Sequence, residues 1–139
     1  MNDSIVQMLQ NTPLWSGLTN QDLGLVAKYS EERGFDSGHT IVSKGEPGAG
    51  FYLLLEGAVE VRSGEKILAK LGPGQFFGEM SIFDDQPTSA DVVTVERSRI
   101  LFLSANSFKT LLFANPKIAL KMLQELSRRL RNTNEQLGV

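Results

Sequence analysis

Residues 77–90 read "FGEMSIFDDQPTSA", and the interpretation of the whole chain depends on what this stretch does. Gly78 precedes a glutamate and a short apolar run, and glycine can bring the backbone close to a ligand or take a conformation that other residues avoid. If residues 79–83 open a turn of helix, their backbone N–H groups point outward together and favour an anion. A sugar phosphate would satisfy both halves of the stretch, with its phosphate on the amides and a ribose hydroxyl on Glu79. The same spacing also fits an ordinary glycine-rich turn, which is the simpler meaning of such residues.

Composition narrows the class of protein that could carry this stretch. The 139 residues fit a single domain that buries its own core, and the net charge of −2 gives no support for nucleic-acid binding. Cysteine is absent, which excludes disulfides, thiolate nucleophiles and thiolate metal sites. A single histidine, His39, argues against a histidine metal site or a catalytic triad. No apolar run has the length of a membrane span and the first residues lack a signal pattern, so a cytoplasmic protein is expected.

The pattern of apolar residues predicts a mainly β protein with helices at both ends. Residues 1–38 are predicted to form N-terminal helices, one of which begins at the N-cap Thr19 with Asp22 at its third position. From residue 39 to residue 103, short apolar runs with a period of two alternate with glycine-rich turns. This alternation favours a small antiparallel barrel or jelly roll, and the absence of strand–helix–strand units argues against a doubly wound sheet.

The end of the chain, residues 104–139, returns to helical periodicity. Asn115 and Pro116 read as a cap followed by proline at the first helical position. The helix that follows carries one broad apolar stripe, made of Ala119, Met122, Leu123, Leu126, Leu130 and Leu137. Glu125 and Arg129 are spaced to pair on its flank, worth about 0.2–0.5 kcal/mol. The stripe either packs entirely on the chain's own barrel or leaves some residues for a second chain.

A longer stretch that contains the opening one, "LGPGQFFGEMSIFDDQPTSADV", resembles the phosphate-binding cassette of the cyclic nucleotide-binding domain family. Three further stretches resemble the family's leading helix, early barrel and closing helix, namely "TPLWSGLTNQDL", "IVSKGEPGAGFYLLLEGAVEV" and "NPKIALKMLQELSRRLRNTNEQLG". The closing helix resembles that of the bacterial catabolite activator branch in particular. The resemblance covers essentially the whole chain and implies one domain over residues 1–139. It implies an eight-stranded jelly-roll barrel with flanking helices, the cassette at residues 72–90, and cAMP or cGMP bound in the barrel.

The resemblance also implies which residues of the cassette bind the ligand. Gly78 and Glu79 stand where the family holds the ribose 2′-hydroxyl, and the amide of Met80 joins the phosphate donors. Ser89 matches a position that is often a small residue facing the phosphate. The complete set of ligand-binding residues that the resemblance implies is Phe77, Gly78, Glu79, Met80, Thr88, Ser89, Ala90, Arg129, Thr133 and Asn134.

The closing helix supplies the last three of these residues. Thr133 stands where the catabolite activator branch contacts adenine, and Asn134 follows it. Arg129 falls where it can pair with Glu79, although it can equally be an ordinary solvated arginine within "SRRLR". In the family this helix packs over the ligand and reports occupancy to an effector or a partner subunit. A homodimer through the C-terminal helix, or an effector protein, is therefore the implied partner.

The chain departs from the family pattern at Thr88. The family's phosphate-binding arginine should stand between Pro87 and Ser89, and it normally makes a bidentate, charge-assisted contact with the cyclic phosphate. A threonine hydroxyl can donate one neutral hydrogen bond but cannot neutralise charge. Because hydrogen bonds to charged groups contribute about 1.5–3 kcal/mol, the replacement is expected to weaken binding about ten- to a hundredfold or more.

Three classes of function can be compared on these observations: a ligand sensor, an interaction module and an enzyme. The first is a sensor that binds cAMP or cGMP weakly and relays occupancy through the C-terminal helix, which the presence of Glu79 and Thr133 favours. The second is a degenerate protein-interaction or dimerisation module, or one that binds a different ligand with less negative charge. An enzyme is not expected, because no acid, base or nucleophile constellation is visible, and no cofactor besides the ligand is expected. The chain ends at Val139 where the catabolite activators continue into a helix-turn-helix, so DNA binding by this chain is not expected either.

Overall fold

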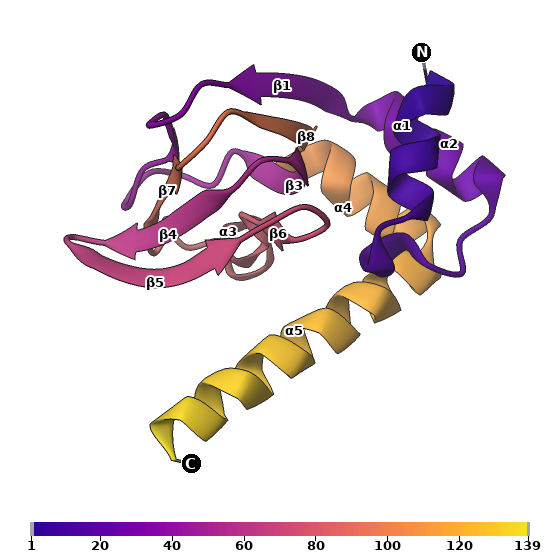
Figure 1. Ribbon diagram of the computed structural model, residues 1–139. Coiled ribbons are helices and arrows are strands. Elements are labelled where there is room, and N and C mark those ends of the chain that lie inside the picture. The colour runs from indigo at the N-terminus through magenta and orange to yellow at the C-terminus, as the bar shows by residue number, and fades with distance from the viewer. Residues whose placement is uncertain (1, 139) are drawn as a thin grey trace. The chain divides into compact units, whose positions relative to one another are not determined.

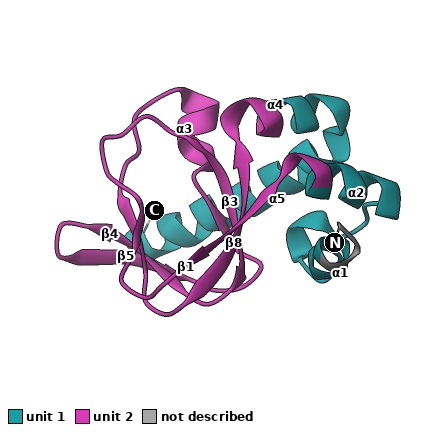
Figure 2. Ribbon diagram, turned by 90° about the horizontal axis from the view of Figure 1, so that it is seen from above, with its two compact units in different colours: residues 1–27, 109–139 teal, residues 28–108 magenta. Residues whose placement is uncertain are grey.

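The computed structural model describes residues 2–138, with side chains from residue 5 onward, and the chain divides into two compact units. One unit comprises residues 28–108 and holds the strands, and the other comprises residues 1–27 and 109–139 (Figure 2). Two helices, α2 (Asn20–Tyr29) and α4 (Ala105–Ala114), run across the boundaries between the units in sequence.

Residues 28–108 form two four-stranded antiparallel sheets (Figure 1). The first sheet has the order β1-β8-β3-β6, with bounds Glu31–Phe35, Ser98–Ser104, Gly50–Glu56 and Phe76–Phe77. The second has the order β2-β7-β4-β5, with bounds Thr40–Val42, Asp91–Thr94, Val59–Ser63 and Lys66–Leu71. Apart from the hairpin of β4 and β5, neighbours in each sheet are not consecutive in the chain, as expected for a jelly roll, so the predicted fold class is confirmed.

The core of this unit is built from inward-facing residues of both sheets. Its buried members are Tyr52, Leu54, Val59, Phe77, Val92, Ile100 and Phe102. The Tyr52 ring stacks on Phe77 with centroids 4.9 Å apart and packs at a tilt against Phe102 at 5.0 Å. Aromatic pairs of this kind add about 0.5–1.5 kcal/mol beyond the burial of their area. This packing holds β3, which carries Tyr52, against β6, which is part of the cassette.

The β-rich part of the chain begins earlier than predicted. Strand β1 lies inside residues 1–38, which were predicted to be helical, and it follows directly after α2 (Asn20–Tyr29). Its sequence "EERGF" has low strand propensity, with two glutamates and a glycine. Pairing with β8 decides its conformation, with Glu31 opposite Phe102 and Phe35 opposite Ser98. The sequence prediction was wrong here because the partner strand lies about seventy residues away, beyond the reach of any local pattern.

The second unit is helical and begins with α1 (Asn2–Gln10) and a short 3₁₀ turn (Pro13–Trp15). The predicted cap of α2 is confirmed, because the Asp22 N–H donates to Thr19 Oγ1 at 3.1 Å. The Thr19 N–H donates in return to Asp22 Oδ2 at 3.3 Å, which completes a capping box. The inner face of this helix is buried and comprises Leu23, Val26 and Ala27.

The last helix, α5 (Pro116–Leu137), is 22 residues long and begins with proline at its first turn, as predicted. Ile118 and Met122 are its buried residues. Much of the predicted stripe is exposed: Leu123, Leu130 and Leu137 are 61%, 62% and 72% accessible. These three leucines are spaced seven residues apart, which places them on one side of the helix.

Candidate functional site

Within the cassette, β6 ends at Phe77 and Gly78 makes the turn into the short helix α3 (Glu79–Asp84). Gly78 has a φ of +91°, a conformation that L side chains rarely adopt. A Cβ at this position would lie 2.5 Å from the Gly50 carbonyl oxygen and 3.0 Å from the Tyr52 ring. Glycine is therefore required both for the backbone conformation and for the close approach of the cassette to β3.

The predicted ligand-binding residues of the cassette have different environments. Glu79, the first residue of α3, is only 4% accessible, whereas Met80 is 58% accessible. Phe77 and Ala90 are buried, and Ser89 is exposed. Phe77 packs on Tyr52 in the core, so its visible role is to hold the cassette on the barrel.

Thr88 fastens the end of the cassette to the loop between β2 and β3. Its hydroxyl donates to the Ser43 carbonyl at 2.5 Å and accepts from the Glu46 N–H at 3.2 Å. The Thr88 N–H donates to the Glu46 carbonyl, and the Gly45 N–H donates to the Thr88 carbonyl, both at 2.9 Å. These four hydrogen bonds are called the Thr88 clasp below. The sequence did not reveal the clasp, because its partners lie 42 and 45 residues apart.

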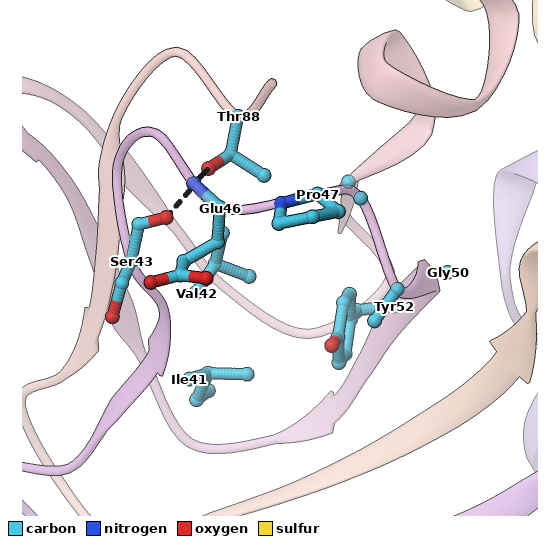
Figure 3. Close-up of a pocket in the computed structure, with 11 residues that line it drawn as sticks. Ile41, Val42, Ser43, Glu46, Pro47, Gly50, Tyr52 and Thr88 are labelled. Carbon is cyan, nitrogen blue, oxygen red and sulfur yellow. Dashed lines mark hydrogen bonds between the residues drawn. The ribbon is translucent and has the colours of Figure 1, made fainter. Parts of the chain in front are cut away.

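A pocket of about 180 Å³ lies beside the clasp, between the β2–β3 loop and the cassette. Its lining comes from residues 41–43 and 46–50, with Tyr52, Gly78 and Thr88. In Figure 3, Thr88, Glu46 and Ser43 lie together at one side of this pocket, and Tyr52 lies across from them. Of the predicted ligand-binding residues, Gly78 and Thr88 reach its wall, whereas the other five of the cassette are not among the lining residues.

Two residues of the pocket, Glu46 and Tyr52, were missed by the sequence analysis. Glu46 belongs to the stretch "GEPGAG", whose glycines and proline predict a turn and carry no sign of a binding function. Tyr52 belongs to the apolar run of β3, where a tyrosine reads as core. Burial raises the pKa of the Tyr52 hydroxyl, while nearby Arg33 acts in the opposite direction. The hydroxyl is thus neutral at physiological pH and able to donate or accept a hydrogen bond.

The predicted ligand contacts Arg129, Thr133 and Asn134 lie on α5, in the other unit. Arg129 Nε lies 3.5 Å from Glu125 Oε1, which confirms the predicted pair. Glu125 is also held by Arg128 at 2.5 Å, and that hydrogen bond is the main reason why the pKa of Glu125 is lowered. Thr133 Oγ1 donates to the Arg129 carbonyl at 3.0 Å. The pairing of Arg129 with Glu79 would join the two units, and it stays a prediction.

Two negative findings hold for the described part of the chain. Within residues 2–138, no helix is both long and apolar enough to cross a membrane. The same residues contain no cluster of three or more acidic or histidine side chains able to hold a metal ion.

Similarity to known proteins shows the family to which this chain belongs. The family model described as "Cyclic nucleotide-binding domain" matches residues 32–115. A CRP-like cAMP-activated global transcriptional regulator from Mycobacterium tuberculosis is 29% identical over 137 residues, which cover 95% of this chain and 61% of that protein. The catabolite activator protein of Thermus thermophilus has a TM-score of 0.83 and 33% identity, covering 91% of this chain and 62% of the other.

A third similar protein is described differently. The regulatory subunit of a cAMP-independent protein kinase A from Trypanosoma brucei has a TM-score of 0.84 and 26% identity. The match covers 99% of this chain and 50% of the other. The present chain spans about three fifths of the length of the M. tuberculosis relative, so a comparable segment is shared with regulators of larger size.

Proposed function

Because the chain belongs to the cyclic nucleotide-binding domain family, we propose that it is a non-catalytic, ligand-sensing regulatory module that binds cAMP or cGMP. One observation carries this proposal: Gly78 holds the cassette against β3, at the wall of a pocket beside the loop that the clasp fastens. Because glycine has no Cβ, it allows this turn and brings the backbone of the cassette close to the pocket. The M. tuberculosis relative, a cAMP-activated regulator, supports the same function.

The binding is expected to be weaker than that of a module with the family's arginine. The single hydroxyl proton of Thr88 is donated to the Ser43 carbonyl, so this side chain cannot donate to a phosphate while the clasp is closed. The charge-assisted contact that an arginine would make contributes about 1.5–3 kcal/mol. Its loss corresponds to about ten- to a hundredfold or more in affinity.

The proposal is tested by calorimetric titration of the purified chain with cAMP and with cGMP. Saturable heat with one site per chain is expected for at least one of the two nucleotides. Glu79→Gln keeps the shape of the buried side chain and removes its charge, so it should weaken the binding if Glu79 accepts a ribose hydroxyl. No heat and no thermal shift with either nucleotide would contradict the proposal.

We further propose that occupancy is relayed through α5 to a second copy of this chain. The supporting observation is the exposed row of Leu123, Leu130 and Leu137, with Leu126 and Thr133 between them at the spacing of a heptad repeat. Leucine at such positions favours a helical dimer. An effector protein that offers its own apolar helix is the alternative partner.

A second function, a dimerisation module without a nucleotide ligand, is favoured by the same row of leucines. The exposed leucines need a partner whether or not the pocket is occupied. The similar T. brucei protein, the regulatory subunit of a cAMP-independent protein kinase A, supports this second function. Dimerisation of the chain without calorimetric binding of any nucleotide or nucleoside would favour this function over the first.

A further inference from the structure

We propose that the pocket beside the Thr88 clasp takes an uncharged ribonucleoside in preference to the corresponding cyclic phosphate. The inference rests on the proposed function in one respect, that this pocket is the ligand site of the module. It differs in the chemical class of the ligand, because the nucleoside lacks the negative charge of the phosphate. Three observations on the pocket carry it.

The first observation concerns the hydrogen-bond donors of the Thr88 clasp, which lies beside the pocket. The N–H groups of Gly45, Glu46 and Thr88 all donate within the clasp, at 2.9 Å, 3.2 Å and 2.9 Å. The Thr88 hydroxyl proton is also used, on the Ser43 carbonyl. A phosphate needs several donors at once, and while the clasp is closed these four groups remain bonded to their present partners and cannot serve it. An uncharged ligand can bind while the four hydrogen bonds of the clasp stay intact.

The second observation concerns charge. Among the residues that line the pocket none is Lys, Arg or His, and Glu46 is the one ionisable carboxylate. The cation nearest in sequence, Lys44, donates its Nζ to Ser63 Oγ at 3.3 Å, and its backbone N–H bonds to Asp91. A cyclic phosphate in the pocket would therefore lie near a like charge with no lining residue to neutralise it. The same carboxylate is a good acceptor for a ribose hydroxyl.

The third observation concerns the remaining walls. Ile41, Val42, Pro47 and Ala49 give the pocket apolar surface, and Tyr52 adds a neutral hydroxyl. The Tyr52 ring is held by Phe77 and Phe102, so its hydroxyl is fixed in place. Apolar walls with a few polar groups suit a flat aromatic base, whereas the hydroxyl groups of the sugar suit Glu46 and Tyr52. A nucleoside matches both kinds of surface.

The test is calorimetric titration of the full chain with adenosine, guanosine, cAMP and cGMP under the same conditions. The better nucleoside is expected to bind about tenfold or more tightly than its own cyclic phosphate. Equal or tighter binding of the cyclic phosphate would overturn the inference and leave the proposed function standing. Binding of a nucleoside without any binding of a cyclic nucleotide would support the inference and contradict the proposed ligand, and no binding of any of the four would overturn both.

A charge variant shows whether Glu46 is responsible for the preference. Glu46→Gln should raise the affinity for the cyclic phosphate about two- to tenfold and lower that for the nucleoside. High salt should likewise strengthen cyclic phosphate binding in the native chain and have no such effect in the variant. Glu65→Gln is the matched control, since Glu65 is exposed in the β4–β5 turn and does not line the pocket. If the two variants change the selectivity equally, Glu46 has no special role and the inference fails.

Discussion

At the scale of single residues, Thr88 holds a loop at the position where the resemblance predicts an arginine for charge recognition. Its hydroxyl joins Ser43 and Glu46, and both bonds would be lost if arginine stood there. The side chain at position 88 therefore affects two properties at once. One is the affinity for an anion, and the other is the stability of the pocket wall.

Thr88→Arg should consequently raise the affinity for cAMP about tenfold or more, because it restores a charge-assisted contact. It should also lower the melting temperature by about 4 °C, because about 1 kcal/mol of hydrogen bonding in the clasp is lost. Calorimetry and thermal unfolding measure the two effects. Thr88→Val is the matched control, since it removes the hydroxyl without adding charge and should lower the melting temperature alone. Unchanged affinity in Thr88→Arg would mean that the cassette cannot present a cation to the ligand.

Gly78 can be tested against a second glycine of the same conformation. Gly78→Ala should destabilise the fold by about 1–3 kcal/mol, because the new Cβ meets the Gly50 carbonyl at 2.5 Å in addition to the strained φ of +91°. Gly64→Ala carries a similar strain, with a φ of +60°, but no atom lies within 4 Å of its Cβ. Urea unfolding of both variants separates the destabilisation caused by the steric contact of the new Cβ from that caused by the positive φ. Equal losses would mean that the close approach to β3 contributes nothing.

At the scale of elements, the first turn of α2 is linked to the start of α5. Asn115 Nδ2 donates to Asp22 Oδ1 at 3.2 Å, and the same carboxylate belongs to the capping box with Thr19. The hydrogen bond from Asn115 is the largest cause that lowers the pKa of Asp22, and the bonds with Thr19 act in the same direction. A single ionised side chain thus caps one helix and holds the residue that precedes another.

This link predicts how stability depends on pH. Because the folded-state pKa of Asp22 is lowered, the stabilisation is present above the pKa of the unfolded chain and is lost as the pH falls through the folded value. Asp22→Asn should therefore be less stable than the native chain near neutral pH, and the difference should shrink below about pH 4. Urea unfolding at several pH values measures it. A difference independent of pH would show that the charge of Asp22 plays no part.

The elements also show which features of the fold and the site could be predicted from the sequence, and why the others could not. The cap at Thr19, the proline in the first turn of α5 and the jelly-roll class were predictable, because each depends on neighbours within a few residues or on a repeated pattern. Strand β1 was not, because its conformation comes from a partner far along the chain. The pocket escaped for the same reason, since Glu46 reaches it only after Thr88 has fastened the loop. Gly78, which lines the pocket, was predicted because it lies within a recognisable local stretch, whereas the role of Glu79 stays a prediction.

At the scale of the whole molecule, the exposed leucines of α5 make association the property to measure. Leu130→Lys places a charge in the middle of the row and should convert a dimer into a monomer in sedimentation or light-scattering experiments. Gln124→Lys is the matched control, because Gln124 is exposed on a different side of the same helix. Both variants should keep the helical signal of the native chain. A monomeric native chain, or equal dissociation of both variants, would contradict the proposed dimer.

The pairing of β1 with β8 has a consequence for synthesis on the ribosome. Residues of β1 emerge early, yet their hydrogen-bond partners at positions 98–102 appear only after most of the chain has been translated. Until then the edge of β3 that β8 will occupy is open, and apolar side chains of the future core face water. Closure of the barrel is therefore a late event that joins distant segments, and such closure is slow compared with helix formation. The nascent chain passes through a period in which its unpaired strand edges need protection from other chains.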